Sequence, residues 1–405
     1  MAQNALRKER YYEDQRGDRN KKSPRAGHGE KPEARSVHEF GSVDYTALLV
    51  IVLLLMIGVV MVFSAGYYTS SNSANMNNDA FYFLKRQGTF AIIGFLVMLF
   101  MSNFNYQMLK KWVWPLYIFS NALLVGVFVL GSATNGAKRW INLPIIGTFQ
   151  PSELSKFAII LAVSYLIYSN KGILKTWKGF FICSGLVGVT ALLVLLGNLS
   201  TALIVGIVGF GIIFVVSPHI TRFVVIAAAG ASSLVAYMAF FSKDFRGDRF
   251  AAWLNPFADP VGYGFQTIQS LYAVASGGLF GLGIGQSRQK SFVPEPHNDF
   301  IFSIICEELG FIGAALIILL FGILVWRGIK IALDAVDSFG FMVATGIVLV
   351  IASQVIINIA VVTNTIPNTG IPLPLISSGG TSLIMTMFML GVLLNISRYT
   401  KSRGT

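Results

Sequence analysis

Residues 45–65 read YTALLVIVLLLMIGVVMVFSA, a run of 21 positions without a charged side chain. The hydrocarbon core of a bilayer is about 30 Å thick, and a helix needs about 20 apolar residues to cross it. The run therefore predicts a membrane-spanning helix. Over all 405 residues the chain is 54% hydrophobic and 12% charged, which is too apolar for a soluble domain of this length. The sequence predicts an integral membrane protein.

Apolar runs of similar length recur along the rest of the chain. Reading each run as one crossing predicts helices near residues 45–65, 87–104, 112–131, 154–168, 179–196, 200–217, 221–241, 301–326, 340–363 and 377–397. The expected fold is an all-α integral membrane protein with about ten transmembrane helices, and residues 45–398 form its membrane domain. The longest connection, residues 242–300, is expected as a large extracytoplasmic loop between helices 7 and 8.

The two ends of the chain differ from this membrane domain. Residues 1–44 contain ten Lys or Arg and eight Asp or Glu with few aliphatic side chains. Such a segment cannot bury enough apolar surface to fold, so we expect a disordered N-terminal tail. It is not a signal peptide, because the first apolar run begins only near Tyr45. Residues 399–405 are expected as a short C-terminal tail.

The positive charges indicate the orientation. An even number of crossings puts both termini on one side, and most basic residues of the short connections fall on that same side. These residues are Lys110, Lys111, Lys171, Lys175, Lys178, Arg327, Lys330, Arg398, Lys401 and Arg403. Because cytoplasmic loops carry an excess of Lys and Arg, both termini are expected in the cytoplasm. The formal net charge of +12 has the same explanation, and no basic stripe with interleaved aromatic residues favours nucleic-acid binding.

The opposite side carries the long connections, which are rich in Gly, Pro and polar residues. A loop as long as 242–300 is usually functional, and irregular backbone near a membrane is tolerated only where protein or a watery cavity satisfies it. We therefore expect the chemistry outside. The four His residues show no ligand spacing, and Cys183 and Cys306 lie inside apolar runs, so neither a metal site nor a disulfide is predicted.

The first polar cluster precedes the predicted helix at 154–168. Its cationic part is Lys138-Arg139-Trp140, for which an interfacial anchor on lipid phosphates is a sufficient explanation. The second part begins at Pro151 and continues through Glu153 to Lys156. Pro and an acidic first turn are typical of a helix start, and Glu153 and Lys156 are spaced to form an ion pair. A lysine at the membrane boundary otherwise indicates an anionic partner.

The second cluster lies in the loop 242–300. It contains Arg246 and Arg249, a glycine-rich run at 276–285, and His297 with Asp299 directly before the next helix. Cations can neutralise a diphosphate, glycines allow backbone N–H groups to approach oxygens, and carboxylates can transfer protons. The glycine run lacks a preceding strand, which argues against a nucleotide site. Asp299 also stands where an N-cap would stand, and capping alone would explain it.

Two further features adjoin these loops. Glu307 and Glu308 lie two turns inside a predicted membrane helix, where a carboxylate is costly unless it faces protein, a cation or water. A buried structural pair and a substrate role remain equally open. Three prolines between residues 367 and 374 exclude a helix there, and Ser377 and Gly379 lead into the last helix. Unpaired N–H groups at that helix start could bind an anion.

In these motifs the sequence resembles the SEDS family, the shape, elongation, division and sporulation proteins. The resemblance spans nearly everything after residue 44. The motifs are Lys138-Arg139-Trp140, Gln150-Pro151-Ser152-Glu153, Asn255-Pro256, Asp259-Pro260, Pro294-Glu295, His297, Asp299-Phe300, Glu307-Glu308, Gly310, Pro367, Thr369-Gly370, Ser377 and Gly379-Gly380. The form of residues 285–290, Gly-Gln-Ser-Arg-Gln-Lys, is closest to the FtsW and SpoVE branches. The chain departs from the family at 197–201, where the usual carboxylate is missing.

The resemblance implies a peptidoglycan glycosyltransferase that polymerises lipid II, with inversion, on the outer face of the bacterial cytoplasmic membrane. By its place in the motif, Asp299 is the expected general base. The expected substrate-binding residues are Lys138, Arg139, Trp140, Glu153, Lys156, Arg246, Arg249, His297, Glu308, Ser377 and Gly379. Among them the cations would stabilise the diphosphate, and Trp140 would stack on a sugar or line the lipid path. A divalent cation, Mg or Mn, could share the diphosphate charge.

The resemblance also implies partners and leaves alternatives. The expected partners are lipid II, membrane lipid, a class B penicillin-binding protein that crosslinks the glycan, and divisome proteins at the septum. The branch favours septal wall synthesis in cell division, with an elongation role of the RodA type or a sporulation role of the SpoVE type as alternatives. A lipid II flippase is the rival of a different class, since it too needs a polar interior path. A scaffold is a third possibility.

Overall fold

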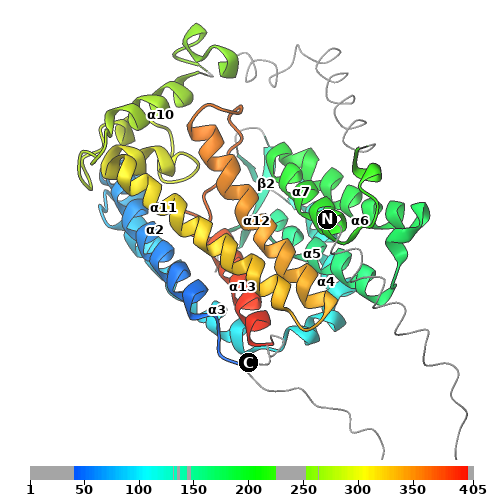
Figure 1. Cartoon of the computed structure of the whole chain (residues 1–405). Helices are drawn as coiled ribbons and strands as arrows, with labels where there is room; N and C mark the ends of the chain where they lie inside the picture. The colour runs from blue at the N-terminus through cyan, green and yellow to red at the C-terminus, as the bar shows by residue number, and fades with distance from the viewer. Residues whose placement is uncertain are drawn as a thin grey trace, which may run out of the picture. The chain divides into compact units, whose positions relative to one another are not determined.

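The computed structural model describes residues 41–130, 132–134, 137–143, 147–224, 252–262 and 264–399. Its long helices are α2 (Tyr45–Ser71), α3 (Tyr82–Asn103), α4 (Leu109–Leu130), α5 (Pro151–Ser169), α6 (Trp177–Gly197), α7 (Leu199–Val216), α10 (Phe265–Ser276), α11 (Ile301–Asp334), α12 (Ser338–Val362) and α13 (Gly380–Arg398) (Figure 1). All but α10 fall where an apolar run predicts a helix. The run at 221–241 lies mostly outside the described residues.

Eight of the described helices are long and apolar enough to cross a membrane: α2, α3, α5, α6, α7, α11, α12 and α13. Their exposed faces are apolar as well. On α2, for example, Leu49 and Met56 are exposed while Ile51 and Leu54 are buried in the protein. A helix that is apolar on all sides is stable only where its outer face meets lipid. The membrane-spanning helical fold is therefore confirmed, and the count of ten crossings stays a prediction.

The helices pack so that the polar cluster before α5 comes into the interior. Helix α3 packs against α13, α11 lies between α2 and α12, and α5 contacts α4, α7 and α12 (Figure 1). Of the eight spans, α5 and α13 are the most buried. The start of α5 is set by Pro151 at the first helical position, with Gln150 as the N-cap and Glu153 in the first turn, as the sequence predicts.

A small antiparallel sheet that the sequence analysis did not predict connects α4 to α5. Its strands are β1 (Ser132–Thr134), β2 (Ala137–Leu143) and β3 (Gly147–Phe149), in the order β1-β2-β3. Ile141 pairs with Phe149, and the hydroxyl of Thr381 at the start of α13 donates to Thr148 O at 3.2 Å. The sheet thus fixes the position of β2, which carries the predicted Lys138-Arg139-Trp140 motif.

Helix α11 is broken at Gly310, whose φ of 68° and ψ of −171° are not helical. The glycine-rich run at 277–283 enters this break. Leu282 N and Gly283 N donate to the carbonyls of Glu307 and Glu308, and two further backbone bonds join 278–279 to the first residues after the break. The backbone groups that lose their helical partners are therefore paired inside the protein, which is the condition for an interrupted helix at membrane depth.

The two ends of the described chain meet at the end of the bundle away from the long loops. Gly41 N donates to Arg398 O at 3.1 Å, and Arg327 forms an ion pair of 2.5 Å with Asp44, the N-cap of α2. Both ends at one side agree with an even number of crossings. The placement of that side in the cytoplasm stays a prediction.

Candidate active site

Two loops meet at the end of the bundle opposite the chain ends. The 294–300 loop leads into α11, and the 364–379 loop connects α12 to α13. The hydroxyl of Ser377 donates to Asn298 O at 2.8 Å and accepts from Leu373 N at 2.8 Å. Ser377, predicted to bind substrate, thus joins the two loops to each other.

A second set of hydrogen bonds, made by α12, joins the two loops. Asn358, a buried residue of α12, donates from its amide nitrogen to Asp299 O and to Ile371 O, at 2.8 Å each. Ser378 N donates to His297 O at 2.8 Å. Because hydrogen bonds in a low-dielectric interior are strong and costly to break, these contacts hold the backbone at Asp299 in one position.

Asp299 does not cap the helix that follows it. The N-cap of α11 is Phe300, and no side chain caps the first turn. The structural explanation that the sequence left open for this carboxylate is therefore absent. Asp299 remains partly exposed at the junction of the two loops, so its carboxylate is available for another role.

The surroundings of Asp299 favour its protonated form. Burial among protein atoms raises the pKa of its carboxyl from the ordinary value near 3.8 to about 6. This pKa of about 6 already includes the negative charge of Glu295, which raises it, and the positive charge of Arg139, which lowers it. A carboxylate with a pKa just below neutrality is ionised at neutral pH and still basic enough to accept a proton, as a general base requires.

Space beside the Asp299 carboxylate is kept open by Gly370. Its φ of +64° lies in the left-handed region, and a Cβ built there would stand 3.1 Å from Asp299 Oδ2. Only glycine adopts this backbone conformation without strain. The position therefore requires glycine for its conformation as well as for its closeness to the carboxylate.

His297 lies two residues before Asp299 and is buried against α3. Its ring is 4.1 Å from the ring of Phe83, centroid to centroid. Burial, and then the positive charge of Arg86, lowers the pKa of the imidazole to about 4. His297 is thus neutral at physiological pH, and its Nδ1 has no hydrogen-bond partner among the described residues. A neutral imidazole can hold a substrate hydroxyl by a hydrogen bond but supplies no charge.

The cationic and acidic residues before and in α5 come together as predicted. Lys156 Nζ lies 2.8 Å from Glu153 Oε1, and both side chains are almost completely buried. Arg139 donates from Nε to Gly197 O at 2.7 Å and, with Ser152, lines a small cavity at the start of α5. The Glu153–Lys156 pair neutralises itself, so among the described side chains of this cluster the net positive charge comes from Arg139.

Glu308 has contacts that account for its burial without a substrate. Its carboxylate accepts from the Ser64 hydroxyl at 2.6 and 2.7 Å and from Ser287 N at 3.3 Å, with Lys290 Nζ 3.8 Å away. The neighbouring Glu307 accepts from the Ser287 hydroxyl and from the backbone N–H groups of residues 288 and 289. Of the two explanations left open by the sequence, these contacts favour the structural one.

The remaining predicted residues divide into three groups. Arg246 and Arg249 lie outside the described residues, and only the backbone of Lys138 is described. Trp140 is half-buried on β2 beside Arg139. Gly379 is the N-cap of α13, and its backbone is extended. The helix therefore begins at residue 380 and not at residue 377 as predicted.

Four residues that act on Asp299 or His297 were not predicted as site residues: Glu295, Asn358, Gly370 and Arg86. Asn358 had a detectable signal, because an amide in an otherwise apolar membrane helix needs an interior partner. Gly370 and Arg86 come from segments that are distant in sequence, whereas Glu295 lies only four residues before Asp299 and belongs to the Pro294-Glu295 motif. No group of three or more His, Cys, Asp or Glu side chains that could hold a metal by itself occurs in the described part of the chain. Glu295 and Asp299 could supply carboxylates to Mg²⁺ only together with substrate phosphates.

The fold and site define a class of protein: a multi-pass membrane protein with a basic carboxylate held between loops at one end of the bundle. Residues 45–402 match the cell cycle protein family FtsW/RodA/SpoVE. The chain therefore belongs to this family, the SEDS proteins.

Individual relatives agree with this assignment. The chain is 44% identical to stage V sporulation protein E of Bacillus subtilis (strain 168), over 89% of this chain and 98% of that protein. It is 41% identical to the probable peptidoglycan glycosyltransferase FtsW of Geobacter sp. (strain M18), over 89% and 98%. Among solved structures it resembles a chain described under "Structural coordination of polymerization and crosslinking by a peptidoglycan synthase complex", with a TM-score of 0.74, 27% identity and coverage of 89% and 99%.

Proposed function

We propose that this chain is a peptidoglycan glycosyltransferase that joins lipid II units into glycan strands, with Asp299 as its general base. The activity is supported by relatives named peptidoglycan glycosyltransferases that match along nearly their whole length. The observation that carries the residue assignment is the Asp299 carboxyl, which caps no helix, stays partly exposed and has a pKa of about 6.

The chemistry needs one proton acceptor and one site of positive charge. The 4-hydroxyl of the acceptor sugar attacks the anomeric carbon of the donor, a new C–O bond forms, and the bond to the lipid diphosphate breaks. Asp299 takes the hydroxyl proton, and the departing diphosphate keeps the electron pair of the broken bond. Direct displacement inverts the anomeric centre. Arg139, whose positive charge acts on Asp299, would stabilise the diphosphate.

The decisive experiment compares Asp299→Asn with Asp259→Asn. Asn keeps the size of the side chain, and no cap is lost, so Asp299→Asn should fold and lose about 10²- to 10⁴-fold in polymerisation rate. Asp259 accepts a hydrogen bond from Gly262 N at 3.0 Å and has this structural role in its turn, so its variant should lose much less. Near-normal glycan synthesis by Asp299→Asn would remove this residue from the mechanism.

The same preparation separates the polymerase from a flippase. Liposomes containing the protein receive labelled lipid II on one side only. Polymer on that side supports the proposal, whereas movement of label to the other side without polymer supports a flippase. If neither polymer nor movement of label is observed, a scaffold is favoured.

The cellular role and the partners belong to the same proposal. We expect a crosslinking class B penicillin-binding protein and divisome proteins as partners at the septum, with both chain ends in the cytoplasm. The solved relative comes from work on a complex that couples polymerisation and crosslinking. A sporulation role has specific support too, because stage V sporulation protein E is 44% identical. Localising a tagged chain in dividing and in sporulating cells distinguishes these two roles.

A further inference from the structure

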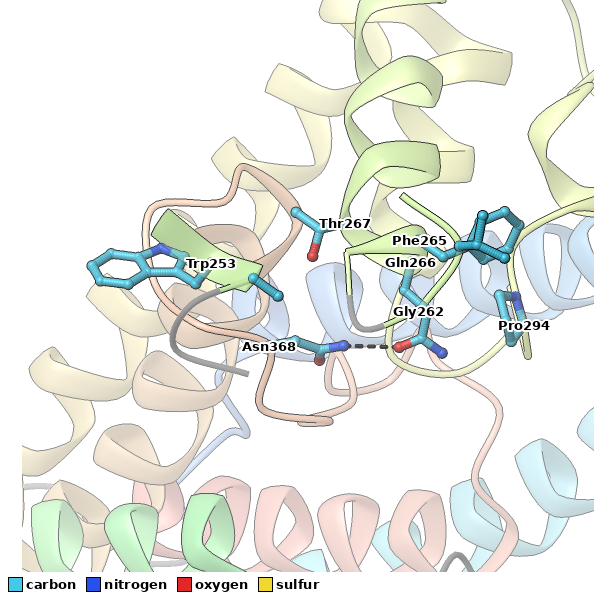
Figure 2. A pocket seen from close by; sticks show the side chains of 9 residues that line it. Trp253, Gly262, Phe265, Gln266, Thr267, Pro294 and Asn368 are labelled. Atoms are coloured by element: carbon cyan, nitrogen blue, oxygen red, sulfur yellow. Dashed lines mark hydrogen bonds between the residues drawn. The ribbon is translucent and has the colours of Figure 1, made fainter. Parts of the chain in front are cut away.

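A cavity of about 310 Å³ lies beside the two loops that hold Asp299. Its walls come from the turns before α10, from the first residues of α10, and from both loops. The side chains that matter are Trp253, Val261, Phe265, Gln266, Thr267 and Asn368. Figure 2 shows Trp253 on one side of the cavity and Phe265 near Pro294 on the other, with Gln266 and Asn368 between them. This volume is at the lower end for ligand pockets and suits one sugar ring.

The polar groups of the cavity form a pair of amides. Asn368 Nδ2 donates to Gln266 Oε1 at 2.9 Å (Figure 2). Two amides joined by one hydrogen bond leave one amide nitrogen and one amide oxygen at the edge of the pair, and neither has a further partner among the described residues. Two partly buried amides are therefore presented side by side with one donor and one acceptor to offer.

Apolar side chains stand beside this pair, and one of them, Trp253, is held in place. The indole N–H of Trp253 donates to Asn364 O at 3.0 Å, and Asn364 donates back to Trp253 O at 3.3 Å, so the ring is held by the 364–379 loop. Phe265 and Val261 supply further apolar surface. Aromatic rings beside a few placed polar groups are the usual composition of a small-ligand site.

We propose that this cavity binds the acetamido group of a substrate sugar, with Gln266 and Asn368 as its specificity-determining residues. An acetamido group has one carbonyl acceptor, one N–H donor and one methyl group. The amide nitrogen of Gln266 can donate to the carbonyl, the amide oxygen of Asn368 can accept from the N–H, and the aromatic wall can cover the methyl. A plain hydroxyl in place of the acetamido group would leave part of this set unpaired.

The cavity is close enough to Asp299 to serve the proposed reaction, on which this inference rests. Asn368 lies two residues before Gly370, and two residues of chain span at most about 7 Å. A Cβ built on Gly370 would in turn stand 3.1 Å from Asp299 Oδ2, and Pro294, which lines the cavity, belongs to the same loop as Asp299. The sugar bound here would be the acetamido sugar of the acceptor, whose 4-hydroxyl must reach the base.

The test uses two disaccharides that differ in the group concerned. Di-N-acetylchitobiose carries acetamido groups, and cellobiose carries hydroxyls at the same carbons. Binding of each to the purified full chain is measured by ligand-observed NMR titration. Two hydrogen bonds of about 1 kcal/mol each predict at least roughly tenfold tighter binding of chitobiose. Gln266→Leu and Asn368→Ala should each abolish this preference. Gln269→Leu, on the same helix but outside the cavity wall, should keep it.

Equal affinities for the two disaccharides, or an unchanged preference in both cavity variants, would overturn the inference. Displacement of chitobiose by an acetylated dipeptide amide with higher affinity would overturn it too, because the pair would then be a peptide site. Chitobiose preference without lipid II polymerisation would keep the cavity assignment and reject the proposed function. If Gln266→Leu and Asn368→Ala polymerise lipid II with an unchanged KM, the proposed function is kept and the cavity assignment is rejected.

Discussion

The pKa of Asp299 predicts the pH dependence of glycan synthesis. A base must be deprotonated to act, so the rate should fall as pH decreases through the pKa of about 6. With this value about 91% of the Asp299 carboxyl is ionised at pH 7 and about 9% at pH 5, so the rate should drop about tenfold. A carboxyl at the ordinary value near 3.8 would still be about 94% ionised at pH 5, and the rate would hardly change.

Two variants should shift the acid limb of the pH–rate profile, the part in which the rate falls with decreasing pH, in opposite directions. Glu295→Gln removes a negative charge that raises the pKa of Asp299, so the limb should shift to lower pH. Glutamine can still accept the hydrogen bond that Asn298 Nδ2 donates to Glu295 Oε2 at 2.7 Å. Arg139→Gln removes the positive charge that lowers this pKa, so the limb should shift to higher pH.

The assay is the initial rate of lipid II polymerisation at saturating substrate between pH 4.5 and 8, with the folded fraction checked at each pH. Titration of the lipid diphosphate is common to the wild type and Glu295→Gln and cancels in their comparison. The assignment of Asp299 as the titrating base would be refuted if the midpoint of the wild-type acid limb lay below pH 5. It would also be refuted if Glu295→Gln and Arg139→Gln had the same midpoint.

Three further predictions concern stability and orientation. Lys156→Met leaves Glu153 as an unpaired buried charge and should lower stability by about 3–5 kcal/mol, whereas the double variant with Glu153→Gln should recover much of this loss in thermal unfolding. Gly370→Ala should cost about 1–2 kcal/mol and reduce activity, because φ is +64° and the new methyl faces Asp299. Gly88→Ala, inside α3 with open space around it, should keep activity and lose no stability. Single cysteines at Ser132 and Asn364 should react with an impermeant external reagent and one at Lys171 should not; the reverse pattern would invert the predicted orientation.

The sequence predicted the elements whose signals are local. Hydropathy located the described membrane helices to within a few residues at most ends, and Pro151 with Glu153 marked the start of α5. The largest error was at α11, which continues to Asp334 where the apolar run predicted an end near 326. The strands β1 to β3 were missed because segments of only three to seven residues carry no clear alternation.

The parts of the site that could not be predicted depend on contacts between distant segments. Glu308 could not be assigned to a structural or a substrate role from its own helix, because its partners are Ser64 on α2 and the backbone at Ser287. The pKa of Asp299 likewise depends on Arg139, which precedes it by 160 positions and reaches it only through the sheet after α4. Periodicity and local spacing contain no information about such pairs.

The break in α11 explains how these distant segments set the position of one carboxylate. A continuous helix of 34 residues would move as one rod, and Asp299 at its start would follow every tilt of its far end. At Gly310 the helical hydrogen bonds are replaced by bonds to residues 278–283. The short segment 299–309 is therefore also held by α2, which binds Glu308 through Ser64, and by α12, which binds the Asp299 carbonyl through Asn358. Since catalysis requires the base to be placed within a fraction of an ångström, this separation favours a fixed carboxylate on a helix that can still adjust to the membrane.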